Sequence, residues 1–294
     1  MSLPDVDTSY EPYADDPIYV SVNQALVDTI DLQDIERVAD LACGTGLLTG
    51  LLFERKPAVS VCGIDLDPQQ IEIARRKLGT RRQIVGDLQE WRTNGVGAVH
   101  LRVGNAQQLP FADGEIDLVM IANAIHMMTE RQAFLAEVRR VLRPRGAFVF
   151  NSAFFVGTLA AGTEPFYTEW LRQAVARLDE MNETRAKQGL PPITRRRGTT
   201  GRAFSKGWLS PEHWQEALEE AGFVVERNFK RAMPISREGL KRVAAYGGMA
   251  EVLMSGYPLE VSSACLQAGA DAAFTAFGMQ EVSRYWLEIT AVRG

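Results

Sequence analysis

The sequence has few of the features that mark a secreted, metal-binding or membrane-spanning protein. Three cysteines in 294 residues, Cys43, Cys62 and Cys265, form neither a metal-ligand spacing nor an even set for disulfides. No stretch approaches the run of about 20 apolar residues that spans a bilayer, and residues 1–7 lack the basic and apolar parts of a signal peptide. We therefore expect a cytoplasmic protein with no bound metal and no contact with a membrane.

Positive charge is also scarce relative to negative charge. The chain carries 32 Lys and Arg against 37 Asp and Glu, a net charge of −5, so no global attraction draws it to nucleic acid. Hydrophobic residues make up 46% of the sequence, which is enough for a full core. A chain of this length forms one large domain or one domain with a large insertion.

One stretch combines a buried strand, a glycine turn and the start of a helix. Residues 38–41 are apolar except for Asp40. Two glycines, Gly44 and Gly46, follow this run, and residues 47–53 have the composition of a helix start. The glycines let the turn approach a ligand closely because they have no Cβ. The first helical turn offers free N–H groups to a polar ligand. Taken alone, the stretch is equally compatible with a tight turn that binds nothing.

The residues of this turn argue against a dinucleotide as the ligand. A dinucleotide fingerprint requires a third glycine three residues after Gly46, where this sequence has Thr49. The carboxylate of Asp40 would repel a pyrophosphate, but it can pair with the cationic end of a ligand. S-adenosylmethionine carries an ammonium and a sulfonium group, so we predict that it binds here and that NAD does not.

A second buried strand, residues 59–65, ends in an acid. Asp65 follows Gly46 at close to the roughly 20-residue offset at which an acid binds ribose hydroxyls in βαβ nucleotide sites. Asp67 has a simpler explanation, because it directly precedes Pro68 and can cap the next helix. We therefore predict that Asp65 is the ribose ligand.

Further buried strands are expected at residues 98–103, 116–122 and 147–151. Asn105 follows the first of these strands and Asn123 follows the second. Strands that alternate with helices form a parallel sheet with helices on both faces, and such sheets bind ligands beyond the carboxyl ends of their strands. The polar residues that follow four successive strands are therefore expected to meet at one edge.

These residues resemble the conserved motifs of the class I S-adenosylmethionine-dependent methyltransferases. In motif I of that family an acid is followed by a small residue and glycines, as in Asp40 and the run Cys43–Gly46; Ala42 stands where many members have the first glycine. Later the family has glycine, aspartate and alanine, then a segment matched here by Leu109–Phe111. Asn105 replaces the aspartate that accepts a hydrogen bond from the adenine amino group, and its amide oxygen can also accept one.

The resemblance covers residues 36–151 closely and two later segments, 210–229 and 284–292, loosely. It implies an α/β fold with a doubly wound, Rossmann-like, seven-stranded sheet in the order 3-2-1-4-5-7-6, whose last strand is antiparallel. It also implies S-adenosyl-L-methionine as cofactor and S-adenosyl-L-homocysteine as product. The expected cofactor contacts are Asp40, Ala42, Cys43, Gly44, Gly46, Asp65, Leu66, Asn105, Ala106 and Asn123.

After Asn151 the alternation stops, and we expect the chain to have three parts. Residues 1–151 form an N-terminal flap and the cofactor-binding core, residues 152–209 a helical lid insertion, and residues 210–294 the rest of the sheet with a second helical insertion. The lid insertion carries aromatic residues without strand periodicity. We predict that it covers, together with residues 1–20, a closed apolar site for a small organic acceptor.

Two segments allow two interpretations each. Residues 20–30 are expected to form a helix that either packs on the sheet edge or acts as a flap over the cofactor. The run Arg195–Arg197, with Arg202 and Lys206, is either a solvated loop or a clamp for an acidic acceptor.

His126 is the candidate catalytic residue. Methyl transfer mainly requires that nucleophile, methyl carbon and sulfur be held in line, but a hydroxyl or carboxylic acid acceptor must also lose a proton. His126 lies on the loop after the strand at 116–122, and an imidazole with an ordinary pKa of about 6.5 suits a base. A role in shaping the acceptor site is an equal alternative.

The expected function is methyl transfer to an oxygen or nitrogen atom of a small organic acceptor, in secondary metabolism. One alternative is a relative that binds S-adenosylmethionine but catalyses cyclisation or decarboxylation. Another alternative is a non-catalytic partner subunit. The sequence argues against it, because it retains Asp40, Asp65 and both glycines. The chain is expected to act alone or as a homodimer.

Overall fold

The computed structural model describes residues 11–94, 96–196 and 207–294. The chain divides into two compact units, which we describe separately. The sheet unit comprises Val20–Val156, Leu209–Arg231 and Trp286–Gly294. The helical unit comprises the described residues of Met1–Tyr19, Gly157–Trp208 and Ala232–Tyr285.

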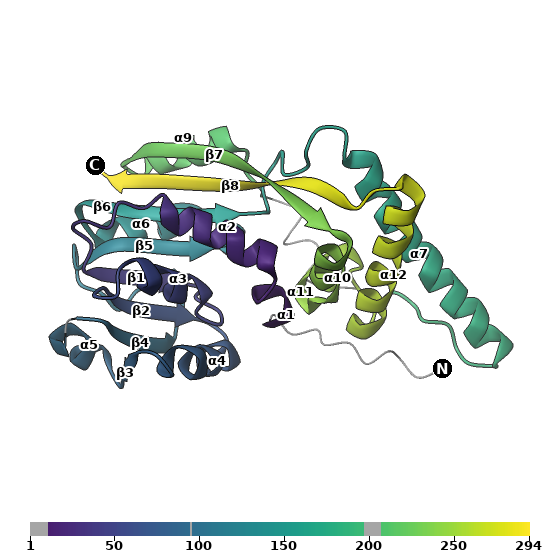
Figure 1. Ribbon diagram of the computed structural model, residues 1–294, viewed down its shortest axis with the longest axis horizontal. Helices are drawn as coiled ribbons and strands as arrows, with labels where there is room; N and C mark the ends of the chain where they lie inside the picture. Colours follow the sequence, from purple (N-terminus) through teal and green to yellow (C-terminus); the bar gives the residue numbers. More distant parts are fainter. Residues whose placement is uncertain (1–10, 95, 197–206) are drawn as a thin grey trace. The chain divides into compact units, whose positions relative to one another are not determined.

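An eight-stranded sheet forms the centre of the fold, in the order β3-β4-β2-β1-β5-β6-β8-β7 (Figure 1). The pairs that join β3 through β6 are all parallel, and β8 is antiparallel to β6. The strands are β1 (Arg37–Leu41), β2 (Ser60–Asp65), β3 (Gln83–Val85), β4 (Ala98–Val103), β5 (Ile116–Ala122), β6 (Leu142–Ser152), β7 (Phe223–Ser236) and β8 (Glu281–Arg293).

The predicted α/β class and the antiparallel late strand are confirmed, whereas the predicted count of seven strands is wrong. The additional strand is β3, which pairs in parallel with β4, with Gln83 opposite Ala98. Without β3, the remaining strands follow the expected order. Three residues are too few to show strand periodicity, so the sequence showed only a long connection at this place.

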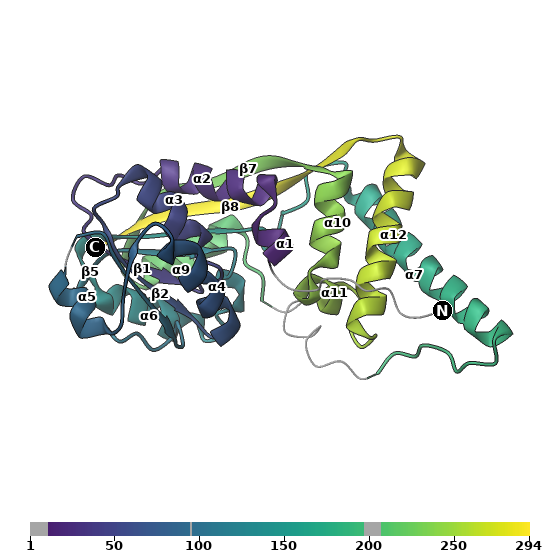
Figure 2. The ribbon, with the colours of Figure 1, turned by 60° about the horizontal axis from the view of Figure 1, so that its bottom comes forward.

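Helices cover both faces of the sheet (Figures 1 and 2). On one face a single apolar cluster joins α2, α3 and α4 to side chains such as Val38, Leu118 and Val149. On the other face, Phe134 of α6 and Trp214 of α9 contact the rings of residues 148 and 150 in β6. The helices named in this unit are α2 (Pro17–Asp28), α3 (Leu47–Arg55), α4 (Pro68–Gly79), α5 (Leu88–Asn94), α6 (Arg131–Val141) and α9 (Pro211–Glu220).

Local signals explain where several of these helices begin. Asp67 caps α4, accepting a hydrogen bond of 2.8 Å from the backbone N–H of Gln69, and Pro68 occupies the first turn. Ser210 caps α9 in the same way through the backbone N–H of His213. The capping role predicted for Asp67 is thereby confirmed.

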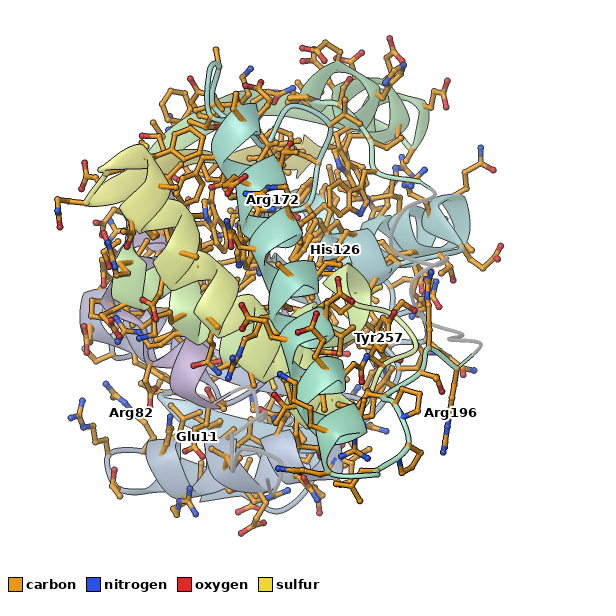
Figure 3. All side chains as sticks on the ribbon, turned by 90° about the vertical axis from the view of Figure 1, so that its right-hand side faces the viewer. Glu11, Arg82, His126, Arg172, Arg196 and Tyr257 are labelled. Carbon is orange, nitrogen blue, oxygen red and sulfur yellow. The ribbon has the colours of Figure 1, made fainter. Side chains whose placement is uncertain are left out.

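The helical unit is built around the contact between α7 (Glu164–Lys187) and α12 (Leu259–Phe277), which lie side by side (Figure 3). Gly269 makes this contact close, because a Cβ there would lie 2.7 Å from the backbone nitrogen of Ala174. The indole N–H of Trp170 donates to the carbonyl oxygen of Leu266 at 2.8 Å. Among the described residues, this unit also contains α1 (Glu11–Ala14), α10 (Arg237–Ala245) and α11 (Gly247–Leu253).

The two segments that resemble the family loosely, residues 210–229 and 284–292, overlap strands β7 and β8 without matching their bounds. Strand β7 continues beyond the first segment to Ser236, and β8 extends beyond both ends of the second segment. Element ends are what local sequence specifies least well.

Candidate active site

The parallel register brings the carboxyl ends of four strands to one edge of the sheet. Asp40 of β1 lies beside Gly63 of β2, and Asp65 at the end of β2 lies beside Val103 at the end of β4. The end of β5 is paired with Asn151 of β6. The residues predicted from sequence to follow these strands therefore belong to the same edge.

The turn after β1 departs from ordinary backbone conformation at three alternate residues. Ala42, Gly44 and Gly46 have φ values of 51°, 53° and 82°, all in the left-handed region. The region costs a residue with a Cβ about 1 kcal/mol or more, so Ala42 adopts a conformation for which glycine is better suited. Two reasons favour glycine at position 46. One is its positive φ, and the other is that a Cβ there would lie 2.9 Å from Cδ1 of Leu78.

Asp40 is buried and only one of its oxygens has a partner. Its Oδ2 accepts a hydrogen bond of 2.6 Å from the hydroxyl of Thr49 on α3, whereas its Oδ1 has no hydrogen-bond partner among the described residues. Burial raises the pKa of Asp40 to about 7, although the Thr49 hydroxyl opposes the shift. A buried carboxylate oxygen without a partner is costly, and a cationic ligand would satisfy it.

Thr49 therefore has a positive role that sequence reasoning missed. Its position was interpreted only as the absence of a third glycine. In the structure its hydroxyl orients the Asp40 carboxylate, because the two positions lie on consecutive elements, β1 and α3. An acid followed nine residues later by threonine was the signal that could have indicated this contact.

Asp65 shapes the same turn from the neighbouring strand. Its Oδ2 accepts from the backbone N–H of Gly44 at 2.8 Å, and its Oδ1 accepts from that of Asp67 at 2.9 Å. A carboxylate oxygen has two lone pairs, so each oxygen can accept one further hydrogen bond. The ribose role predicted for Asp65 stays a prediction, and the structural role was not foreseen.

The ends of β2 and β4 present apolar side chains beside a polar loop. Leu66 is 70% exposed and Val103 is 49% exposed, whereas Ala106 is buried. Asn105 is exposed, and its Oδ1 accepts from the backbone N–H of Gln107 at 2.9 Å. An aromatic ligand could lie on the apolar side chains and bond the amide of Asn105.

Cys43 lies inside this edge rather than on it. Its thiol is buried, its Sγ would lie 3.1 Å from a Cβ at Gly63, and burial raises its pKa well above the ordinary value. The thiol is therefore a packing group, and any contact of Cys43 with a ligand would use its backbone.

The ends of β5 and β6 are joined by asparagines. Asn123, with φ of 52°, donates its backbone N–H to the carbonyl oxygen of Asn151 at 3.0 Å, and its Oδ1 accepts from the backbone N–H of Ala153 at 2.9 Å. The amide of Asn151 donates in turn to Oδ1 of Asn23 on α2, at 2.9 Å. The side chain of Asn123 thus holds the two strand ends together, and its cofactor role stays a prediction.

His126 follows Asn123 in a single 3₁₀ turn, Ile125–Met127. Its half-buried ring lies against the ring of Phe154, with centroids 4.1 Å apart and planes inclined at 36°. Phe154 follows the end of β6, so the joint between β5 and β6 determines how the two rings meet. The imidazole lies on the loop of a strand whose carboxyl end belongs to the candidate site.

The described part of the basic run belongs to the helical unit. Arg195 donates through Nε to the carbonyl oxygen of Ser255 at 2.8 Å, and the backbone N–H of Arg196 donates to that of Gly256 at 2.7 Å. These contacts attach the start of the run to the connection between α11 and α12 in its own unit. The other residues of the predicted clamp, Arg197, Arg202 and Lys206, lie outside the described residues.

Comparison with known proteins identifies the domain that contains these residues. A family model described as a methyltransferase domain matches residues 39–150. The chain carries a class I S-adenosylmethionine-dependent methyltransferase domain. This match spans the glycine turn, Asp65, the loop after β4 and His126.

Curated relatives resemble this methyltransferase domain only in part. The domain is 34% identical over 124 residues to the ubiquinone/menaquinone biosynthesis C-methyltransferase UbiE of Citrifermentans bemidjiense, covering 42% of this chain and 48% of that protein. It is 35% identical over 115 residues to the O-methyltransferase cnsE of Penicillium expansum, covering 39% and 37%. The chain therefore spans less than half the length of these relatives.

Solved structures share the fold of this chain over most of its length. The [4+2]-cyclase SpnF matches with a TM-score of 0.52 and 17% identity, covering 93% of this chain and 81% of the other. The YcgJ protein of Bacillus subtilis matches with a TM-score of 0.51 and 17% identity, covering 93% and 98%. At this identity the likeness concerns the fold alone.

S-adenosylmethionine is the cofactor of this methyltransferase domain, and the residues present fit it. The unsatisfied Oδ1 of Asp40 suits a cationic group, and Asp65 and Asn105 offer further acceptor oxygens. In the described part of the chain, no group of three or more His, Cys, Asp or Glu side chains could hold a metal ion. No helix among the described residues is both long and apolar enough to cross a membrane.

Proposed function

We propose that this protein transfers the methyl group of S-adenosylmethionine to an oxygen or nitrogen atom of a small organic acceptor. The observation that carries the proposal is the buried, half-satisfied carboxylate of Asp40, within a methyltransferase domain. When bound, the cofactor supplies a sulfonium-activated methyl group. The residues of the chain bind the cofactor, orient the acceptor and accept a proton from it.

The proposed cofactor contacts divide by chemistry. Asp40 accepts a charge-assisted hydrogen bond from the ammonium group, Asp65 accepts from the ribose hydroxyls, and Asn105 accepts from the adenine amino group. Leu66 offers an apolar surface to the adenine ring. The remaining proposed contacts are made by backbone that lies close to the cofactor, at Ala42, Cys43, Gly44, Gly46, Ala106 and Asn123.

His126 is the proposed base for an acceptor with an acidic O–H or N–H group. The imidazole would accept the proton of this group, which leaves a more nucleophilic acceptor atom. The contact with Phe154 limits the orientations open to the ring. An acceptor that loses its proton without help would leave His126 only a positioning role.

The helical unit is proposed to cover the bound acceptor. We keep the division into residues 1–151, 152–209 and 210–294, in which the middle segment covers the acceptor together with residues 1–20. A small acceptor needs such a cover because water must be excluded from the reacting groups. A homodimer and an acceptor from secondary metabolism remain part of this proposal.

Product analysis with labelled cofactor tests the function. The protein is incubated with S-adenosylmethionine labelled in its methyl group and a panel of small acids, phenols, hydroquinones and amines. The names of the relatives include carbon and oxygen methylation, so the panel contains acceptors of both kinds. Label in an O- or N-methylated product supports the proposal. A product without label, formed while the cofactor stays intact, would instead favour cyclisation or decarboxylation.

A further inference from the structure

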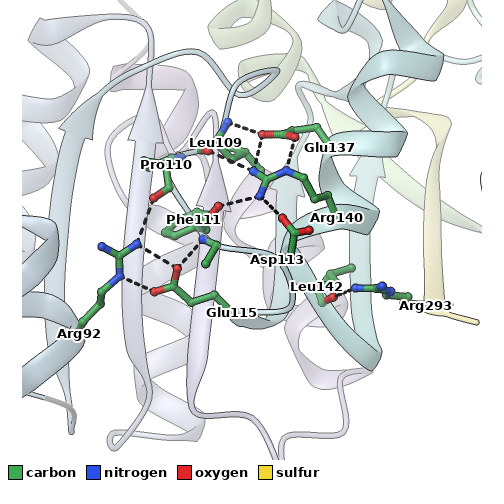
Figure 4. Close-up of polar contacts among 11 residues, drawn as sticks. Arg92, Leu109, Pro110, Phe111, Asp113, Glu115, Glu137, Arg140, Leu142 and Arg293 are labelled. Atoms are coloured by element: carbon green, nitrogen blue, oxygen red, sulfur yellow. Dashed lines mark hydrogen bonds and ion pairs between the residues drawn. The ribbon is translucent and has the colours of Figure 1, made fainter.

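Two arginines hold the loop that carries Asn105. Residues 104–115, between β4 and β5, contain no helix or strand, so the ladder does not fix their backbone. Arg140 on α6 and Arg92 on α5 bind this loop from two sides (Figure 4). Neither arginine was singled out by its sequence context.

Arg140 contacts both the loop backbone and two carboxylates. Its guanidinium donates to the carbonyl oxygens of Phe111 at 2.8 Å and Leu109 at 3.3 Å. It also binds Asp113 at 2.8 Å and both oxygens of Glu137 at 2.8 and 2.9 Å. Glu137 completes the arrangement by accepting from the backbone N–H of Leu109 at 2.8 Å. The pair on α6 therefore binds both the N–H and the C=O of Leu109.

Arg92 binds the other side of the loop through a similar arrangement. Its Nε and Nη2 donate to the two oxygens of Glu115 at 2.6 and 3.0 Å, and Nη2 also donates to the carbonyl oxygen of Pro110 at 3.2 Å. Glu115 accepts in turn from the backbone N–H of Ala112 at 2.7 Å. The loop is thus bound at four consecutive residues, 109–112.

The charges in both arrangements are stabilised by these contacts. The Arg140 guanidinium lowers the pKa of Glu137, and Arg92 lowers the pKa of Glu115 against the opposing effect of burial. Bidentate arginine–carboxylate pairs are among the stronger hydrogen-bonded interactions in proteins. Both arginines are about a third exposed, so the contribution to overall stability is modest and the main consequence is geometric.

We propose that Arg140, supported by Glu137, is a positioning residue for the adenine end of the cofactor. It holds the loop so that the amide of Asn105 meets the adenine amino group. This inference rests on the adenine role proposed above for Asn105. Loss of Arg140 lowers the fraction of molecules whose loop is competent, and the apparent affinity falls by the same factor.

The loop has a second anchorage, which makes the effect specific. Leu109 and Phe111 are buried, and the ring of Phe111 lies 5.9 Å from that of Trp91. These apolar contacts keep the loop attached when Arg140 is replaced. The segment near Asn105 gains freedom while the fold remains.

The test compares two ligands that differ only at the 6-position of the purine and the adjacent N1. S-adenosylhomocysteine and S-inosylhomocysteine, in which oxygen replaces the amino group and N1 carries a hydrogen, are titrated by calorimetry into the wild-type protein and Arg140→Met. We expect the wild type to prefer S-adenosylhomocysteine by about tenfold, the worth of one hydrogen bond of about 1.4 kcal/mol. Arg140→Met loses most of this preference, as Asn105→Ala does, while its melting temperature shows that it remains folded.

Two controls make the outcome decisive. Asp113→Asn alters the most exposed partner of Arg140, whose side chain is 81% exposed, and should change the ratio of the two affinities less than twofold. Arg140→Lys keeps the charge but cannot bind Leu109, Phe111 and Glu137 together, so it should also lose most of the preference. It replaces Arg140→Met in the test if the methionine variant does not fold. A wild-type preference retained in both Arg140 variants overturns the inference. No binding of S-adenosylhomocysteine to the wild type would instead contradict the proposed function.

Discussion

Asp40 links the cofactor site to pH at the scale of a single residue. Its pKa is raised from the ordinary 3.8 to about 7 by burial, so the folded protein keeps a proton that the unfolded chain releases above about pH 4. The stability contributed by this group is complete below about pH 4 and is lost as pH rises through 7. An ammonium ligand favours the ionised carboxylate, so its binding should release a proton near neutral pH.

We predict that the affinity for S-adenosylhomocysteine rises between about pH 6 and pH 8. Calorimetry in buffers of different ionisation enthalpy measures the released proton directly. Asp40→Asn should bind more weakly, release no proton and be more stable than the wild type at pH 8 without ligand. An affinity of the wild type that does not change with pH would contradict this account of Asp40.

His126 gives a second prediction at this scale. Loss of a general base typically lowers the rate by a factor of about 10²–10⁴, so His126→Ala should lower turnover of the acceptor found in the panel while cofactor affinity stays nearly unchanged. His126→Gln keeps a hydrogen-bonding group without a base. Near-full turnover in the glutamine variant would leave only positioning, and full turnover in the alanine variant would remove His126 from the mechanism.

Single residues also show where prediction from sequence succeeds and where it does not. The position of Asp65 at the end of β2 followed from the offset and the buried strand. Its bond to the backbone N–H of Gly44 could not, because that bond depends on the left-handed turn. Thr49 was misjudged for the same reason, since only the folded pairing of β1 with α3 brings its hydroxyl to Asp40.

At the scale of elements, helix α2 packs on the core of the sheet unit from Val20 onward. Leu26, Val27 and Ile30 belong to the same apolar cluster as the sheet, and the buried Asn23 accepts from the amide of Asn151. The helix therefore supports the contact between the ends of β5 and β6, next to the loop that carries His126. The role of residues 1–20 as a cover stays a prediction.

We predict that Asn23→Leu destabilises the protein by about 1–3 kcal/mol, because the buried amide of Asn151 loses this acceptor. Urea denaturation measures the change, and hydrogen exchange of residues 123–128 should become faster. Asn23→Asp retains an acceptor and should preserve slow exchange there. Gln24→Leu, a change at a half-buried position of the same helix, serves as control. Equal exchange in Asn23→Leu and the control would show that α2 does not support this contact.

The elements that sequence predicted well were the strands buried in the middle of the sheet. The parallel strands β1, β2, β4 and β5 are apolar runs bounded by turn residues, which is the pattern of a buried strand. Strand β3 has only three residues, which are too few to establish an alternating pattern. Its existence depends on pairing with β4, which is a tertiary contact.

At the scale of the whole molecule, the proposal assigns the acceptor to the segments outside the sheet unit. We predict that hydrogen exchange slows in residues 11–19 and 157–196 when cofactor and acceptor bind together. Cofactor alone should protect the glycine turn and the loop at 104–115 but not these segments. No change in either segment with both ligands present would leave the insertion as a surface elaboration of the fold.

Calorimetric titration of the whole chain with S-adenosylhomocysteine and with NAD tests the central claim most directly. The buried acceptor of Asp40 and the turn that contains Thr49 predict that S-adenosylhomocysteine binds one site per chain. The same features predict that NAD shows no binding, since its pyrophosphate would meet the Asp40 carboxylate. Binding of NAD without binding of S-adenosylhomocysteine would contradict the account.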